Sequence, residues 1–223
     1  MIVILLGAPG TGKGTQAELL ARSLSIPKLS TGEMVRAEIQ SETTLGKRIQ
    51  EINNSGQLVS DDIMIELVNT RLENSDCQNG FILDGFPRTL PQAEELEVIL
   101  ARFPNNQVFV INFDVEESVL VKRLSGRFTC KSCGTCYHVT FNRPSVEGVC
   151  DKCGSHEFIH RSDDNEEAVK IRLKVYQDKT APLINYYKKR EKLYVINGMQ
   201  SIDAISENIK ALITGKNSNF AVV

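Results

Sequence analysis

Residues 7–15, Gly-Ala-Pro-Gly-Thr-Gly-Lys-Gly-Thr, constrain the fold more than any other segment of this chain. They follow an unbroken apolar run at residues 2–6 and precede a helix-like pattern over residues 16–21. A strand, a glycine-rich turn and a helix in this order form the context of a phosphate-binding loop. Glycines let backbone N–H groups point at an anion, and the helix adds its positive N-terminal end. With Lys13 as a mobile positive charge, the segment predicts a nucleoside triphosphate site.

The net charge argues against a function that requires a strongly basic surface. The 223 residues carry 26 Lys and Arg against 28 Asp and Glu, a formal net charge of −2, so we expect no nucleic-acid partner. The sequence contains no run of about 20 apolar residues, and the apolar residues 2–6 lack the basic lead of a signal peptide. We therefore expect a cytoplasmic protein without a membrane partner.

In that compartment the six cysteines are expected to be reduced thiols or metal ligands.

Apolar strand-like runs alternate with helical patterns along the chain. Strands are expected at residues 2–6, 27–29, 81–83, 108–113 and 193–196. Helices are expected at residues 61–72, 90–103, 116–124 and 201–213. Runs that are apolar on both faces suit a parallel sheet covered by helices, so the predicted class is three-layer α/β with a five-stranded parallel sheet. Ligands of such sheets bind beyond the carboxyl ends of the strands.

Two segments interrupt the alternation. Residues 30–59 insert two helical patterns, and residues 127–164 lack helical periodicity but are rich in Cys, Gly and aromatic residues. We expect both to be small insertions. The core then comprises residues 1–29, 60–126 and 165–223.

Local signals predict where several helices begin and end. Ser30 and Glu33 have capping-box spacing, which predicts a helix start, and Gly56 is a candidate stop for the second inserted helix. Residues 165–177 form a long helical pattern, after which Pro182 opens or kinks the next stretch. The tail at residues 215–223 has no periodicity and is expected to fray.

The third apolar run ends in Asp84-Gly85-Phe86-Pro87-Arg88. A carboxylate at the end of this strand can anchor Mg²⁺ or its waters beside a phosphate loop. Gly85 permits close backbone approach to a ligand, and Arg88 can clamp a phosphate. Alone, Asp84 would be more typical of a cap or turn, but its combination with residues 7–15 favours the metal role.

Several longer motifs together resemble the adenylate kinase family. They are GAPGTGKGTQ at residues 7–16, STGEMVR at 30–36, LDGFPRTLPQA at 83–93, RLSGR at 123–127, and the acidic pair before Arg172, Asp163 and Asp164. Many phosphate loops have Ser or Thr directly after the lysine. Here Gly14 precedes Thr15, which is the form that this family uses. The loop alone would indicate only a nucleoside triphosphate, whereas the combination is highly specific.

The resemblance implies a P-loop nucleoside monophosphate kinase fold. In that fold, residues 30–59 would be a helical AMP-binding insertion and residues 127–164 a zinc-ribbon lid. The implied function is an adenylate kinase, a monomeric phosphotransferase that catalyses ATP + AMP ⇌ 2 ADP with Mg²⁺ and so balances adenine nucleotides.

The resemblance also implies roles for individual residues. The ATP-binding residues would be Gly10, Thr11, Gly12, Lys13, Gly14, Thr15, Arg123, Arg127 and Gln200. The AMP-binding residues would be Thr31, Arg36, Gln57, Leu58, Val59, Gly85, Arg88, Gln92, Arg161 and Arg172. The catalytic residues would be Lys13, Asp84, Arg88, Arg123, Arg127, Arg161 and Arg172. Asp163 and Asp164 would orient the lid arginines, and the Phe86–Pro87 bond would be cis.

The arginines also have a rationale that does not depend on the family. ATP and AMP together carry on the order of six negative charges, because the second pKa of a terminal phosphate is about 6. Arg123 and Arg127 would share one helix face if the helix extended to residue 127. No general base is needed, since the AMP phosphate is already ionised. Catalysis can be positioning and charge stabilisation, with closure of the insertions to exclude water.

Four cysteines have the spacing CxxC-x₁₆-CxxC: Cys130, Cys133, Cys150 and Cys153. This spacing predicts a zinc ribbon whose four thiolates leave no open position, so the metal would be structural, although iron can also occupy such a site. Cys136 forms a competing CxxC with Cys133. Glycine follows Cys133 and Cys153 but not Cys136, so we expect Cys136 to be a spare thiol. Substitution of a ligand by Cys136 or by a histidine remains open: His138, His156 or His160.

Two other functions compete with this prediction. A kinase for UMP, CMP or GMP would have the same fold, but Gln92, Thr31 and the cysteine-rich lid favour AMP. A zinc-ribbon NTPase that depends on nucleic acid could stack bases on Tyr137, Phe141 and Phe158. The net charge of −2 counts against that second alternative.

Overall fold

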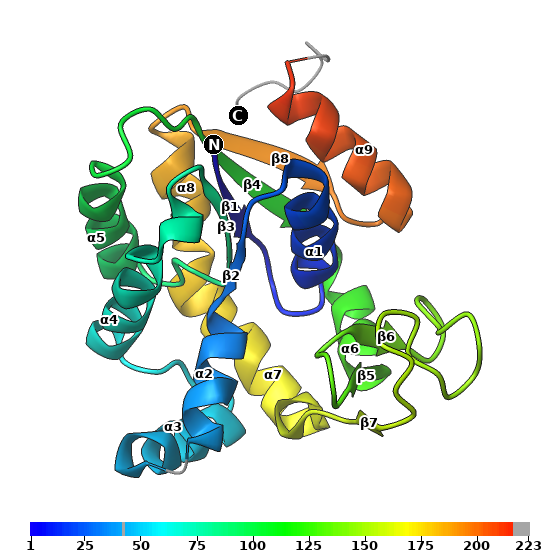
Figure 1. Ribbon diagram of the computed structural model, residues 1–223. Helices are drawn as coiled ribbons and strands as arrows, with labels where there is room; N and C mark the ends of the chain where they lie inside the picture. Colours follow the sequence, from blue (N-terminus) through cyan, green and yellow to red (C-terminus); the bar gives the residue numbers. More distant parts are fainter. Residues whose placement is uncertain (42, 216–223) are drawn as a thin grey trace.

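Five short apolar runs form one parallel sheet in the computed structural model, which describes residues 1–41 and 43–215. The strand order is β2-β3-β1-β4-β8 (Figure 1). The strands are β1 (Ile2–Leu6), β2 (Lys28–Ser30), β3 (Phe81–Asp84), β4 (Val108–Asp114) and β8 (Leu193–Asn197). All five predicted strands are therefore confirmed.

Helices cover both faces of this sheet. They are α1 (Lys13–Leu24), α4 (Asp61–Leu72), α5 (Leu90–Leu100), α6 (Glu117–Ser125), α7 (Glu166–Val175), α8 (Pro182–Lys188) and α9 (Ile202–Ile213). A short 3₁₀ turn, η1 (Ser75–Cys77), precedes β3. The predicted three-layer α/β class is confirmed. The helix predicted at residues 90–103 ends earlier, at Leu100.

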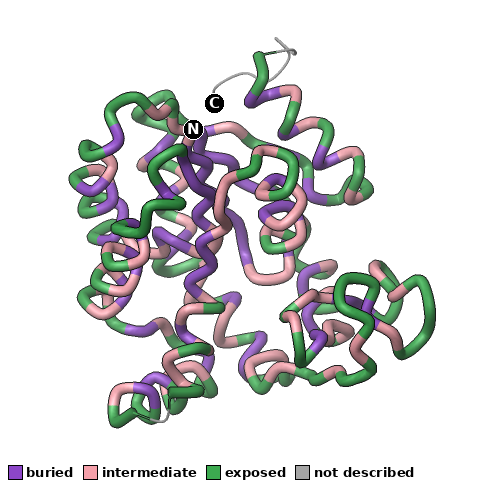
Figure 2. Tube along the Cα trace, in the orientation of Figure 1, coloured by how far each residue is buried: buried purple, intermediate pink, exposed green. Residues whose placement is uncertain are grey.

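The central strand β1 is buried on both faces, as its unbroken apolar sequence predicts. Ile2, Ile4 and Leu6 pack in one cluster with residues of α4, α5 and α8. Val3 and Leu5 point the other way and pack with residues of α1 and α9. Figure 2 shows these strands as the buried centre of the molecule. Side chains alternate along a strand, so one apolar run serves two cores.

Residues 30–59 contain two helices, α2 (Thr31–Gln40) and α3 (Thr44–Asn54). The predicted helix start after Ser30 is confirmed, but the capping box is wrong, because the Ser30 side chain makes no capping hydrogen bond. The Glu33 carboxylate instead accepts from Lys28 Nζ at 2.6 Å. The second helix stops before Gly56, whose φ of 74° is left-handed, as predicted.

Residues 127–164 form a separate three-stranded antiparallel sheet, ordered β6-β5-β7, beside α6 in Figure 1. Its strands are β5 (Arg127–Cys130), β6 (Cys136–His138) and β7 (Phe158–Ile159). Because α6 ends at Ser125 and Arg127 opens β5, the condition for Arg123 and Arg127 to share a helix face is not met.

The chain returns to the core through η2 (Ser162–Asp164) and α7, which continues into a π-helical turn, η3 (Tyr176–Thr180). Pro182 opens α8, as predicted. The expected fraying of the tail falls mainly on residues 216–223, which lie outside the described residues. No helix within residues 1–41 or 43–215 is long and apolar enough to cross a membrane.

Candidate active site

The glycine-rich segment forms a loop between β1 and α1. Gly10 and Gly12 have φ values of 88° and 96°, a region that favours glycine. Gly12 is the N-cap of α1, and no side chain caps this helix. The first N–H groups of α1 are therefore available for an anion.

Lys13 lies against the loop that it follows. Its Nζ donates to the carbonyl oxygens of Gly7 at 2.6 Å and Ala8 at 2.9 Å. Burial lowers the pKa of Lys13 to about 8, with the neighbouring Asp84 opposing this shift and Arg88 adding to it. The loop therefore holds a dehydrated positive charge where a phosphate would bind.

Asp84 ends β3 beside this loop, because β3 pairs with β1 in a register that places Asp84 next to Leu5. A Cβ on Gly14 would lie 3.3 Å from Asp84 Oδ2. A Ser or Thr after Lys13 would therefore crowd the carboxylate. Glycine at this position leaves the space between the loop and Asp84 free.

One cleft of about 1580 Å³ lies at the carboxyl edge of the sheet. Most of the predicted site residues line it: Gly10, Thr11, Gly12, Lys13, Gly14, Thr15, Arg36, Gln57, Leu58, Asp84, Gly85, Arg88, Arg123, Arg127, Arg161, Arg172 and Gln200. Three others, Thr31, Val59 and Gln92, are buried and are absent from its lining.

Gln92 holds the neighbouring backbone in place. Its Oε1 accepts from the Arg88 N–H at 2.8 Å, and its Nε2 donates to Asp61 at 2.7 Å. One amide hydrogen and one oxygen lone pair remain, so adenine recognition by Gln92 stays a prediction. Thr31 Oγ1 donates to the Gly85 carbonyl at 2.8 Å.

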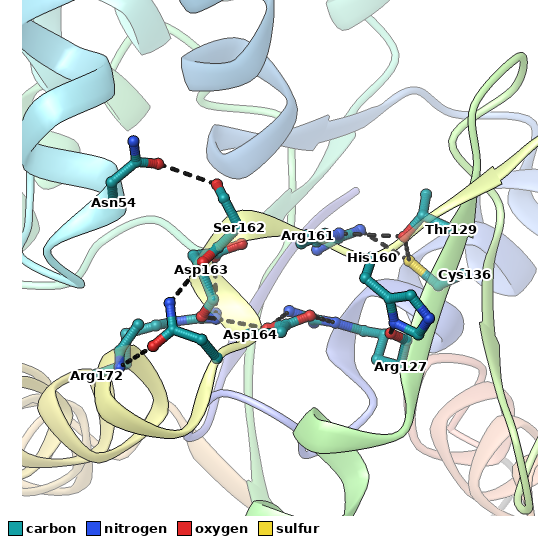
Figure 3. A network of polar contacts seen from close by, with 12 residues as sticks. Asn54, Arg127, Thr129, Cys136, His160, Arg161, Ser162, Asp163, Asp164 and Arg172 are labelled. Atoms are coloured by element: carbon teal, nitrogen blue, oxygen red, sulfur yellow. Dashed lines mark hydrogen bonds and ion pairs between the residues drawn. The ribbon is translucent and has the colours of Figure 1, made fainter.

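Asp164 joins two arginines from different parts of the chain (Figure 3). It accepts from Arg127 Nε at 2.7 Å and from Arg172 Nη1 at 2.9 Å. Asp163 Oδ2 lies 2.9 Å from Arg172 Nη1. Burial alone would raise the pKa of Asp163, but Arg172 and Arg127 hold it below its usual range. Asp163 therefore stays ionised, and the two carboxylates together orient these guanidinium groups.

Two other guanidinium groups of the cleft, those of Arg88 and Arg36, are partly buried near further positive charges. Burial, followed by repulsion from Arg172, lowers the pKa of Arg88. Burial and then Arg161 likewise lower the pKa of Arg36. Bound phosphates would relieve this repulsion, so the cleft is electrostatically prepared for anions.

Arg123 extends from α6 toward the segment after β8. Its Nη1 donates to the Gly198 carbonyl at 3.0 Å, and its guanidinium lies 5.9 Å from the centre of the Phe141 ring. The backbone around Gln200 borders the same part of the cleft. A planar base could therefore meet a guanidinium plane and an aromatic ring here.

The sulfur atoms of Cys130, Cys133, Cys150 and Cys153 all lie within 4.8 Å of one another. Two of the separations are 3.6 Å (Cys130 to Cys153) and 3.5 Å (Cys133 to Cys150). A tetrahedral zinc with bonds of about 2.3 Å requires separations of about 3.8 Å, so the four residues fit this metal.

Backbone geometry agrees with the predicted pairing of the cysteines. The N–H groups of Gly134 and Gly154 donate to the carbonyls of Cys130 and Cys150 at 2.9 Å and 2.8 Å, which closes two matching turns. Cys136 is not part of the four-sulfur group. His138 is engaged elsewhere, since its Nδ1 accepts from the Thr140 N–H at 2.9 Å.

Comparison with known proteins agrees with this geometry. The family model described as adenylate kinase matches residues 5–192. A protein named adenylate kinase from Allorhizobium ampelinum is 48% identical over 96% of this chain and 100% of its own length. Similar proteins of the same name come from Clostridium novyi (48% identical, 96% of this chain, 99% of that protein) and Caldicellulosiruptor bescii (49%, 95% and 99%).

The chain belongs to the adenylate kinase family. The cis Phe86–Pro87 bond that the resemblance implied is present. The four-cysteine group lies in the segment that the resemblance identifies as the lid.

Two residues that contact arginines of this cleft were not among the predicted site residues. Thr180, on the π-helical turn η3, donates to the Arg88 carbonyl at 2.8 Å. Cys136, set aside as a spare thiol, lines the cleft and contacts Arg161. No local pattern marks either contact, because both join segments that are distant in the sequence.

Proposed function

We propose that this protein catalyses reversible phosphoryl transfer between ATP and AMP, giving two molecules of ADP. The observation that supports this most strongly is the charge of the cleft. A phosphate loop, Asp84 and six arginines from separate segments converge there: Arg36, Arg88, Arg123, Arg127, Arg161 and Arg172. One nucleotide does not require so many cations, whereas ATP and AMP together carry on the order of six negative charges.

ATP would bind with its phosphates on the loop and its adenine between Arg123 and the segment near Gln200. AMP would bind at Arg36 and Arg88, with Thr31, residues 57–59, Gly85 and Gln92 around its base and ribose. The AMP phosphate is ionised near neutral pH and can attack the terminal phosphoryl group without a general base. Lys13 and the lid arginines would stabilise the charge of the transferring group.

Mg²⁺ bound with ATP would offset phosphate charge, and Asp84 would hold its water shell. The closeness of Asp84 Oδ2 to the phosphate loop, 3.3 Å from where a Cβ on Gly14 would lie, supports this assignment.

We infer that residues 30–59 and 127–164 are mobile insertions on a core of residues 1–29, 60–126 and 165–223. Closure of these insertions would exclude water, which otherwise competes with AMP for the phosphoryl group. We also infer that the lid binds a structural zinc ion, and that the enzyme acts as a cytoplasmic monomer.

A panel of nucleoside monophosphates in a coupled ADP assay tests the substrate. AMP should be phosphorylated with the highest kcat/KM, because Thr31 and Gln92, which hydrogen-bond the backbone of Gly85 and Arg88, would favour its adenine. A preference for UMP, CMP or GMP would contradict the choice of AMP but not the reaction class. ATP hydrolysis stimulated by RNA or DNA in the absence of AMP would favour a nucleic-acid-dependent NTPase.

A further inference from the structure

Arg161 is held by a hydroxyl side chain and a cysteine side chain on neighbouring lid strands (Figure 3). Its Nε donates to Thr129 Oγ1 at 3.2 Å, and its Nη2 donates to Cys136 Sγ at 2.9 Å. Thr129 on β5 and Cys136 on β6 are direct partners across the antiparallel pair. The two acceptors therefore form one platform, with a separation of 3.9 Å between the hydroxyl oxygen and the sulfur.

Arg161 differs in this respect from Arg127 and Arg172, the other two arginines shown in Figure 3. Arg127 and Arg172 are both bound to the Asp164 carboxylate. In the part of the chain that the structure describes, Arg161 forms no ion pair within 4 Å. The Thr129–Cys136 platform is thus what orients its guanidinium group.

The orientation matters because Arg161 lines the cleft together with the phosphate loop and Arg36. Repulsion between Arg161 and Arg36 also contributes to the lowered pKa of Arg36. Because Arg36 repels it, the Arg161 guanidinium needs other contacts to hold it at this position. Thr129 is buried, so its hydroxyl is fixed in the lid sheet.

We propose that Thr129 and Cys136 are positioning residues, which hold Arg161 toward the transferring phosphoryl group. This role rests on the proposed adenylate kinase reaction. A hydroxyl binds a guanidinium more weakly than a carboxylate does, and cysteine sulfur is a weak acceptor. The platform therefore sets the direction of Arg161 without offsetting its charge. The guanidinium can move onto a phosphate without breaking an ion pair.

Steady-state kinetics of T129V and C136A test the proposal. Each variant removes one acceptor, and we expect kcat to fall roughly 3- to 10-fold, less than the factor of about 10² that a 1 Å misplacement can cost. KM for ATP and AMP should change less than twofold. T129S and C136S keep an acceptor and should retain at least half of the wild-type kcat. T140V, the same exchange at an exposed lid position, is the matched control and should not change kcat.

A double-mutant cycle with R161A separates positioning from a general effect on the lid. If Cys136 acts through Arg161, C136A should lower kcat in the wild-type background but change it less than twofold in the R161A background. The same holds for T129V. Melting temperatures show whether either variant is unfolded. If T129V on β5 is unfolded, C136A on β6 provides the test, and the reverse.

The outcomes distinguish this role from the reaction itself. Wild-type kcat in both T129V and C136A, or equal losses with and without Arg161, would overturn the positioning role and leave the adenylate kinase reaction intact. A wild-type protein that forms no ADP from ATP and AMP would overturn the proposed function and this role with it.

Discussion

We expect Lys13 to take part in phosphoryl transfer rather than only to bind ATP. Its Nζ is bonded to the carbonyls of Gly7 and Ala8 and can exchange these partners for phosphate oxygens. The side chain is flexible and carries a point charge, so it can follow a phosphoryl group that moves from ATP to AMP. Stabilisation that grows toward the transition state raises kcat rather than substrate affinity.

Replacing Lys13 with methionine should therefore lower kcat by at least about 10²-fold, the typical loss of one electrostatic stabiliser. The affinity for ATP, measured by direct binding, should change much less, because the backbone of the loop remains. A variant that loses ATP affinity but keeps its kcat at saturating ATP would show that Lys13 only anchors the substrate.

The pKa of Lys13, lowered by burial to about 8, predicts how activity depends on pH. Lys13 is charged below this pH and neutral above it, while the phosphates of both substrates stay fully ionised. The kcat/KM for ATP, which reports the free enzyme, should therefore decrease as the pH rises through about 8. K13R is the control, since arginine stays charged and its profile should remain flat from pH 8 to 10.

The free energy of unfolding should depend on Lys13 in the opposite direction, so that stability increases while activity decreases as the pH rises. The folded-state pKa lies below the usual 10.5, so the folded protein binds the proton less tightly than the unfolded chain. The contribution of Lys13 to the free energy of unfolding should thus increase as the pH rises from about 8 to 10.5. Chemical denaturation of wild type and K13M over this range measures the difference.

The lid sheet is an element that cannot bury enough apolar surface to be stable by itself. Its core consists of Cys130, Tyr137 and Cys150, with Phe128 and Phe158 packed against them. Two of the three buried residues are cysteines of the four-sulfur group. Its shape should therefore depend on the zinc ion that we infer at the four-cysteine group.

Chelation of this metal should lower the melting temperature and leave turnover largely intact at low temperature. Adding back Zn²⁺ should restore the melting temperature, and C136S should bind as much metal as wild type, whereas C150S should bind less. Complete and immediate loss of turnover, with the fold intact, would contradict a structural role for the metal.

One ion pair connects the small antiparallel sheet of residues 127–164 to helix α1 of the core. Lys152, between two cysteines of the four-sulfur group, lies with its Nζ 2.6 Å from Glu18 Oε1 on α1. The hydrogen bond from Lys152 is the largest cause that lowers the pKa of Glu18 to about 2. Both side chains are partly exposed, at 41% and 33%, so the pair contributes only about 0.2–1 kcal/mol.

K152M should therefore shift the unliganded lid toward more open positions by a factor of roughly 1.4 to 5, the range that an exposed pair can supply. Fluorescence energy transfer between labels on the lid and on α9 measures this shift, and high salt should reduce it. K131M is the matched control, because Lys131 pairs with Glu157 within the lid. Equal effects of the two substitutions would argue against a contact that holds the lid to the core.

The parallel sheet, the phosphate loop and the four-cysteine group could be predicted from the amino-acid sequence alone. These features depend on local patterns: apolar runs, glycines at defined positions, and short spacings such as CxxC. The capping box at Ser30 failed because Lys28 takes the Glu33 carboxylate, although the helix still begins there. Local signals set where elements begin more reliably than which side chains meet.

The contacts between distant segments could not be predicted in this way and are seen only in the folded protein. The fold places Asp164 between Arg127 and Arg172, Arg161 on the Thr129–Cys136 platform, and Thr180 against Arg88. Cys136 appeared as a spare thiol because its partner lies 25 positions away. Such contacts follow from how strands pair and where a helix ends, and these depend on packing of the whole chain rather than on any one stretch of it.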